Sequence, residues 1–160
     1  MERVIKFLKK NKTKIAGIVI TLAVGSVSAF VSGNYDTYEA YNKPVFSPPG
    51  WLFPIVWTVL YIMMGFAAGI IAESRDLDRG FALKLYVLQL SINVIWPILF
   101  FRFNAPKFAL FWLALLIVVI VLTIKNFRTI NKTAGNLLIP YLLWCVFAFY
   151  LNFGIVVLNS

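Results

Sequence analysis

Five long stretches of the chain carry no charged residue, and apolar residues dominate each of them. They run over residues 15–35, 44–72, 85–101, 108–124 and 133–160. An α-helix rises about 1.5 Å per residue, so roughly 20 apolar residues cross a hydrocarbon layer of about 30 Å. Each stretch is therefore long enough to cross a bilayer once.

This pattern predicts an all-α membrane protein, a five-transmembrane-helix bundle that uses residues 1–160 as a single domain. Only helices and closed barrels satisfy backbone groups in hydrocarbon, and the stretches lack the alternation typical of barrel strands. A longer lid loop is expected at residues 32–50. The predicted spans are about residues 15–31, 51–72, 82–101, 108–124 and 137–158.

Composition and charge agree with a membrane location. Hydrophobic residues make up 61% of the chain and charged residues only 13%. Of the 15 lysines and arginines, only Lys43, Arg102 and Lys107 fall on one side of the predicted spans, and the other twelve fall on the opposite side. The positive-inside rule then places the amino terminus in the cytoplasm and the carboxyl terminus outside, and we expect a bacterial cell membrane. No helix has the basic face of a nucleic-acid reader, so we expect lipids and no nucleic acid as partners.

The first span has an alternative interpretation. A basic start, an apolar run and the small residues Val27, Ser28 and Ala29 also resemble a signal peptide with its cleavage site. The spacing of Gly25, Ala29 and Gly33 instead favours a retained helix that packs closely on its neighbours.

The missing residue types narrow the chemistry. The chain has no histidine, its six acidic residues lie outside the spans, and Cys145 is its single cysteine. Imidazole ligation of haem, the usual metal sites and proton coupling through a buried carboxylate are therefore excluded. We expect no cofactor and no metal ion, and we interpret Cys145 as a packing residue.

Two stripes of polar and aromatic residues recur at helical spacing in the third and fifth spans. They comprise Gln89, Asn93, Trp96 and Phe100, and Tyr141, Trp144, Ala148, Asn152 and Ile155. A buried amide without a partner is costly in hydrocarbon, so both stripes are predicted to face the bundle. The amides then either join helices or bind a ligand, and Ala148 leaves a notch between larger groups. Trp112 lies among aliphatic residues near a boundary, which favours an interfacial or lipid-facing position.

The start of the second span is stiff and non-helical, because Pro44, Pro48 and Pro49 precede Gly50. Such a segment is predicted to form a fixed lid over the bundle. The spacing of Gly65 and Gly69 indicates close helix packing, either within the subunit or in a homodimer.

Four sequence blocks, in order along the chain, make it resemble the tryptophan-rich sensory protein or translocator protein family. Each block alone is a weak signal, whereas four with matching spacing are specific. They are Lys43-Pro44-x-Phe46-x-Pro48-Pro49-Gly50-Trp51, Trp57-Thr58-x-Leu60-Tyr61-x-x-Met64-Gly65, Gln89-Leu90-x-x-Asn93-x-x-Trp96 with Phe100-Phe101, and Pro140-Tyr141-x-x-Trp144-x-x-Phe147-Ala148-x-x-Leu151-Asn152.

The resemblance implies a five-helix bundle, often dimeric, with a pocket open toward the side of the first loop. Members of the family bind porphyrins such as protoporphyrin IX, and many bind isoquinoline carboxamide and benzodiazepine drugs. Some bacterial members are reported to degrade protoporphyrin in light, and Trp57 and Trp144 match the tryptophans linked to that reaction. The residues implied to line the pocket are Tyr38, Pro48, Trp57, Tyr61, Asn93, Trp96, Trp144, Ala148 and Leu151.

The leading hypothesis is a membrane receptor or carrier for porphyrins and similar lipophilic ligands. The propionates of a porphyrin would stay at the mouth near Lys43, Arg102 or Lys107. One alternative is an enzyme that degrades porphyrin with light or an oxidant through Trp57 and Trp144. Another is a stress-regulatory membrane protein that binds a protein partner. The sterol motif of animal members is not supported, because nothing after Lys132 is charged.

Overall fold

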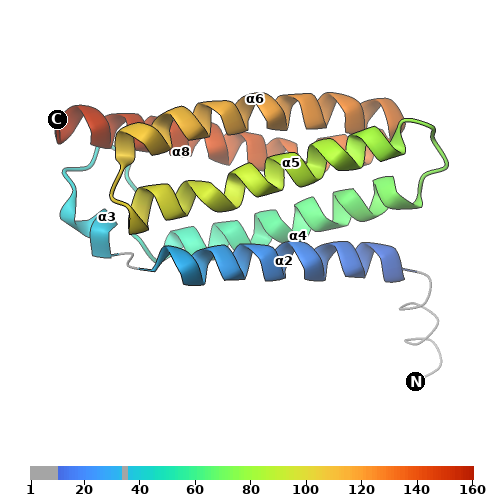
Figure 1. The fold of residues 1–160 in the computed structure, drawn as a ribbon, viewed down its shortest axis with the longest axis horizontal. Coiled ribbons are helices and arrows are strands. Elements are labelled where there is room, and N and C mark those ends of the chain that lie inside the picture. The colour runs from blue at the N-terminus through green and yellow to red at the C-terminus, as the bar shows by residue number, and fades with distance from the viewer. Residues whose placement is uncertain (1–10, 34–35) are drawn as a thin grey trace, which may run out of the picture.

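The computed structural model describes residues 11–33 and 36–160, and its regular structure there is entirely helical. Five helical units are long and apolar enough to span a membrane, and they lie side by side in one bundle (Figure 1). The predicted all-α five-helix bundle is confirmed. The helices are α2 (Lys12–Ser32), α3 (Asp36–Ala40), α4 (Leu52–Glu73), α5 (Arg79–Pro97), the π-helix η1 (Ile98–Arg102), α6 (Pro106–Ile130), α7 (Lys132–Leu137) and α8 (Ile139–Leu158).

The helix contacts give the order of the spans around the bundle. Helix α2 packs most extensively on α4 and also touches α5 and η1; α5 packs on α6, α6 on α8, and α7 and α8 close the ring against α4. Helices α2 and α8 therefore lie on opposite sides of the bundle. The most basic part of the amino terminus, residues 3–10, lies outside the described residues, so the predicted orientation stays a prediction.

The predicted span ends agree with the helix ends to within a few residues, except at the end of the fourth span. Helix α6 continues to Ile130, whereas the prediction ended at residue 124. The length of a charge-free stretch underestimates the length of such a helix. Lys125 and Arg128 are exposed, so the helix continues through them beyond its apolar part. The lid loop predicted at residues 32–50 also contains the short helix α3.

Glycines bring α2 and α4 into close contact at the end of the bundle away from the lid. A Cβ atom on Gly65 would lie 2.5 Å from the carbonyl oxygen of Gly17, and one on Gly69 would clash with Lys14. Farther along, a Cβ on Gly25 would clash with the Tyr61 ring. The Gly65 and Gly69 spacing therefore serves packing within the subunit.

Pro97 interrupts α5 and redirects one hydrogen bond. Proline has no backbone N–H and distorts the helix around it. The next N–H, that of Ile98, donates to the carbonyl of Ile95 rather than to that of Val94, and the chain continues as η1. The Val94 carbonyl instead accepts a 2.7 Å hydrogen bond from Ser28 Oγ of α2. The helix break thus creates a polar contact between two spans.

Replacing Ser28 by alanine is expected to lower the free energy of unfolding by about 1 kcal/mol, because the Val94 carbonyl loses its partner. The matched control is Ser26→Ala, since Ser26 lies two residues away on the same helix and is exposed. Thermal unfolding in detergent measures both. Equal effects of the two substitutions would show that the Ser28 contact does not stabilise the bundle.

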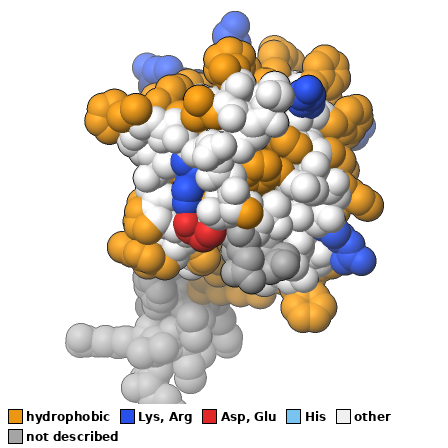
Figure 2. All heavy atoms as spheres, turned by 90° about the vertical axis from the view of Figure 1, so that its left-hand side faces the viewer, with side chains coloured by type: hydrophobic (Ala, Val, Ile, Leu, Met, Phe, Trp, Pro, Cys, Tyr) orange, Lys and Arg blue, Asp and Glu red, His pale blue; other side chains and the backbone are white. Residues whose placement is uncertain are grey.

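The lid covers one end of the bundle. Figure 2 looks onto this end, where backbone and uncharged groups fill much of the face and hydrophobic side chains project around its edge. Pro44 packs so closely on α8 that a Cβ on Gly154 would lie 2.5 Å from its Cγ. Three hydrogen-bonded pairs join the lid to the bundle: Tyr41 with Asn104, Asn42 with Asn159, and Val45 with Tyr150.

Candidate functional site

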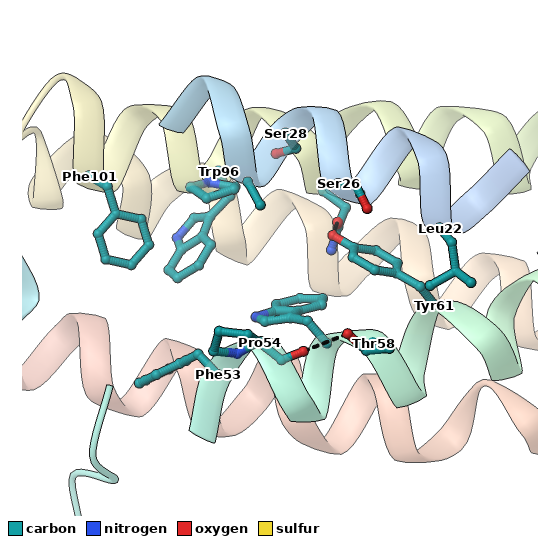
Figure 3. A pocket seen from close by; sticks show the side chains of 14 residues that line it. Leu22, Ser26, Ser28, Phe53, Pro54, Thr58, Tyr61, Trp96 and Phe101 are labelled. Carbon is teal, nitrogen blue, oxygen red and sulfur yellow. Dashed lines mark hydrogen bonds between the residues drawn. The ribbon is translucent and has the colours of Figure 1, made fainter. Parts of the chain in front are cut away.

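A cavity of about 300 Å³ lies between α2, α4 and the α5–η1 segment, in the half of the bundle next to the lid. We call it the main cavity. Figure 3 shows α2 on one side of it and α4 on the other, with side chains from both pointing inward. Its lining residues are Leu22, Gly25, Ser26, Ser28, Ala29, Phe53, Pro54, Trp57, Thr58, Tyr61, Asn93, Trp96, Pro97 and Phe101.

The second span supplies much of this lining because its proline-rich start leads directly into a helix. The N–H of Leu52 donates to the Pro49 carbonyl at 3.0 Å, which begins the first turn of α4. Pro54 is tolerated in that turn, since its missing N–H would have no helical partner. Trp57 and Tyr61 follow at a spacing of four residues, on one face of the helix, and their rings stack with centroids 5.5 Å apart.

Asn93 supplies a polar group to the otherwise largely apolar wall. Its Oδ1 accepts a 2.8 Å hydrogen bond from the Tyr61 hydroxyl, and its Nδ2 donates to the Tyr141 hydroxyl at 3.1 Å. Tyr141 in turn donates to Gln89 Oε1 at 2.8 Å. We call these four residues the amide–tyrosine chain. It joins α4, α5 and α8, so the amide of Asn93 does join helices while it also lines the cavity.

A second, much smaller cavity of about 10 Å³ lies next to the lid and α8. Three rings, those of Phe53, Trp96 and Phe101, line both cavities and separate them. The remaining lining residues of the small cavity are Tyr38, Phe100, Ala148, Leu151, Asn152 and Ile155.

The structure divides the site residues implied by the resemblance into three groups. Trp57, Tyr61, Asn93 and Trp96 line the main cavity. Tyr38, Ala148 and Leu151 line the small cavity, where Trp96 is again present. Pro48 and Trp144 line neither of them. For Trp144 the reason is the helix order, because α8 lies across the bundle from α2 and cannot reach the main cavity past α4 and α5.

Pro48 and Trp144 have other contacts. The Pro48 carbonyl accepts a 3.2 Å hydrogen bond from the Tyr38 hydroxyl, which stabilises the lid. Trp144 is half-buried and packs on Phe53 with ring centroids 5.8 Å apart. Its Nε1, like Gln89 Nε2, is buried without a hydrogen-bond partner among the described residues. The structure therefore does not bring Trp57 and Trp144 together in one cavity.

Sequence reasoning missed the contribution of α2 to the main cavity. Leu22, Gly25, Ser26, Ser28 and Ala29 all line it. The first span is apolar on all sides, so periodicity could not identify a ligand-facing stripe. The small residues Gly25 and Ala29 were the available signal, and they were interpreted as packing positions.

Trp112 makes a contact that its prediction as an interfacial or lipid-facing residue did not include. It is half-buried, and its Nε1 donates a 2.8 Å hydrogen bond to the Ile92 carbonyl of α5. Sequence neighbours could not reveal this contact, because the acceptor is a backbone group on another helix. Trp112 thus joins α6 to α5 outside the cavity.

Lys43 and Arg102, two of the three basic residues expected at the mouth, already have partners at the lid end. Lys43 forms an ion pair with Glu39, which lowers the pKa of that carboxyl through the hydrogen bond from Lys43, and its Nζ lies 4.7 Å from the centre of the Tyr38 ring. Burial raises the pKa of Tyr38, so its hydroxyl remains protonated and can donate to Pro48. Arg102 donates to the Val31 carbonyl at 3.0 Å. A ligand carboxylate at this end would compete with these contacts.

Comparison with known proteins gives consistent matches over most of the chain. The model of the TspO/MBR family matches residues 17–158, which include parts of all five spans. The chain is 41% identical to the tryptophan-rich protein TspO of Chlorobaculum tepidum, over 76% of this chain and 78% of that one. It is 35% identical to the tryptophan-rich protein TspO of Archaeoglobus fulgidus, over 91% and 96%. The translocator protein of Ovis aries is 34% identical, over 72% and 70%.

Proposed function

This chain belongs to the TspO/MBR family of integral membrane proteins, and we propose that it is a receptor or carrier that binds porphyrins and other flat lipophilic ring compounds in the main cavity. The observation that carries this proposal is the cavity wall. It presents the rings of Trp57, Tyr61 and Trp96 and has no charged lining residue. Asn93 adds a single side-chain amide.

The chemistry of the wall suits a flat ring. Apolar burial contributes about 25 cal/mol per Å², and each well-placed aromatic contact adds about 0.5 to 1.5 kcal/mol. A few polar groups in an apolar pocket fix the orientation of a ligand, and the amide of Asn93 and the hydroxyls of Ser26 and Thr58 supply them. Charged ligand groups have no partner inside, so they would remain outside the cavity.

The size of the cavity limits how a porphyrin would sit. About 300 Å³ is at the lower end of the range for small-molecule sites. A change of side-chain rotamer at Phe53 or Phe101 would join the small cavity to the main one and add Ala148 and Leu151 to the binding surface. This proposal would unite the two groups of implied site residues in one ligand-bound site.

Replacing Trp57 by alanine is expected to weaken protoporphyrin binding about tenfold or more, because about 1.4 kcal/mol of ring contact is lost. Titration of the purified protein, followed by quenching of tryptophan fluorescence, measures the dissociation constant. Trp51→Ala is the matched control, since Trp51 is 67% exposed and lines neither cavity.

Trp144→Phe is expected to have a smaller effect than Trp57→Ala, because Trp144 contacts Phe53 rather than the main cavity. Equal affinities of the wild type and the Trp57→Ala variant would show that the main cavity is not the binding site. Absence of any saturable quenching in the wild type would reject porphyrin as a ligand.

A further inference from the structure

The main cavity is open along one side of the bundle. Its exposed lining residues are Ser26 and Ala29 of α2 and Pro54 and Thr58 of α4. We call the gap between them the side opening. In Figure 3, Ser26 of α2 and Pro54 and Thr58 of α4 lie on the two sides of the cavity.

The opposite wall is closed. The cavity lining on α5 and η1 is not exposed. It consists of the buried residues Asn93, Trp96 and Phe101 and the half-buried Pro97. The exposed edge of the cavity therefore lies between α2 and α4 and not at α5.

The inner part of the side opening lies within the apolar length of α2 and α4, which are both long enough to cross a hydrocarbon layer. Ser26 precedes the end of α2 by six residues and Thr58 follows the start of α4 by six, which places both about 9 Å inside the helix ends. Exposed apolar side chains flank the opening, with Phe30 exposed by 88% and Ile55 by 54%. Such a surface requires contact with acyl chains, so the opening faces lipid.

The packing of α2 on α4 explains why the cavity lies in the half of these helices next to the lid. At Gly17 and Gly65 their backbones are in contact, and at Gly25 the Tyr61 ring fills the space between them. Beyond Gly25 no further glycine of these two helices brings them together, and most of the cavity lining on α2 lies from Gly25 to Ala29.

The described part of the lid, residues 36–50, is fixed to the bundle by several contacts. Two hydrogen bonds join the Asn42 backbone to the Asn159 side chain at 3.0 and 2.9 Å, and Tyr150 donates to the Val45 carbonyl at 2.8 Å. Pro44 packs directly on Gly154. Access past the lid would break these contacts, whereas access between α2 and α4 breaks none of them.

We propose that ligands reach the main cavity sideways from the hydrocarbon layer, through the side opening, while the lid stays in place. This inference rests on the proposed function. It restricts the ligands to ring compounds that dissolve in the bilayer and enter with their apolar ring first. Their polar groups trail past the hydroxyls of Ser26 and Thr58 toward the membrane surface.

The test compares obstruction of the side opening with immobilisation of the lid in protein reconstituted into lipid vesicles. Ala29→Phe places a ring at the opening, and protoporphyrin uptake is followed by stopped-flow quenching. The association rate is expected to fall about tenfold, and the dissociation rate is expected to fall with it, because release passes through the same opening. Val27→Phe is the matched control, because Val27 is 63% exposed on the same helix and does not line the main cavity.

The lid is immobilised in the variant with Asn42→Cys and Asn159→Cys by a bis-maleimide crosslink. Cys145 is fully buried and so does not compete for the reagent. We expect the crosslinked protein to take up protoporphyrin at the rate of the same variant before crosslinking. A crosslink that slows uptake about tenfold, together with no effect of Ala29→Phe, would overturn the proposal.

A measurement without porphyrin separates this proposal from the proposed function. Brominated acyl chains quench tryptophan on contact, and the part of the quenching lost in Trp57→Phe reports contact of lipid with the cavity. We expect such quenching, and we expect Ala29→Phe to reduce it. If brominated lipid quenches Trp57 but porphyrin does not bind, the proposed ligand is rejected and the side opening is retained. If brominated lipid does not quench Trp57, the side opening is rejected whatever the ligand is.

Discussion

Gly65→Ala is expected to lower the free energy of unfolding by about 3 kcal/mol, the largest effect of the stability substitutions considered. The new Cβ would lie 2.5 Å from two backbone atoms of α2, the Gly17 oxygen and the Ile18 Cα. Backbone atoms cannot change rotamer as a side chain does, so α2 must move away from α4. That movement also removes favourable contacts along the remaining interface.

Gly80→Ala is the matched control. Gly80 also lies in a helix, but a Cβ there meets no atom within 4 Å. Its substitution is expected to leave stability unchanged or slightly raised, because alanine is the better helix former. The midpoint of thermal unfolding in detergent should fall by about 6 to 12 °C for Gly65→Ala only. Similar losses for both variants would show that the close approach of α2 and α4 does not limit stability.

This use of glycine changes the interpretation of the GxxxG spacing. From the sequence, Gly65 and Gly69 could serve either a homodimer or the subunit itself. In the structure, Gly17 and Lys14 of α2 occupy the space beside them. A partner protein or a second copy would therefore need another surface, and a homodimer stays a prediction. The same contact holds the two helices together below the main cavity.

The sequence predicted the spans and the buried stripes because both depend on local spacing. Gln89, Asn93 and Trp96 share one helical face, and all three are buried as expected. The prediction for the fourth span ended too early, because a helix can extend past the hydrocarbon layer where exposed lysine and arginine side chains reach water.

The distribution of the implied site residues between the main cavity and the small cavity could not be predicted from their spacing in the sequence. Ala148 and Leu151 share a face of α8, yet the cavity that they reach depends on which helices lie beside α8. That order results from packing between segments far apart in the sequence. Similarly, the hydrogen bond from Ser28 to Val94 depends on Pro97, which lies 69 residues further along the chain than Ser28.

Asn93→Leu is expected to lower the free energy of unfolding by about 2 kcal/mol. Leucine has nearly the same size but can neither accept from Tyr61 nor donate to Tyr141. Two buried hydrogen bonds between three helices are lost, and no bulk water is available at this depth to replace them. Bonds in a chain also polarise one another, so the remaining contact between Tyr141 and Gln89 should weaken.

Ser91→Ala provides the control on the same helix. Ser91 is exposed, and its hydroxyl donates only within α5, to the Val87 carbonyl. Its loss is expected to change stability by less than about 0.5 kcal/mol. Thermal unfolding in detergent measures both variants, and the same preparations can be titrated with protoporphyrin.

The unfolding midpoint and the dissociation constant of Asn93→Leu report separately on two roles of Asn93, joining the helices and contacting the ligand. A lower unfolding midpoint with an unchanged dissociation constant would assign Asn93 to helix joining alone. A weaker affinity in protein that remains folded would assign its amide to the ligand as well, which is the result we expect because Asn93 lines the main cavity. Unchanged stability would contradict the role of the amide–tyrosine chain, since a bundle that tolerates leucine here does not depend on those bonds.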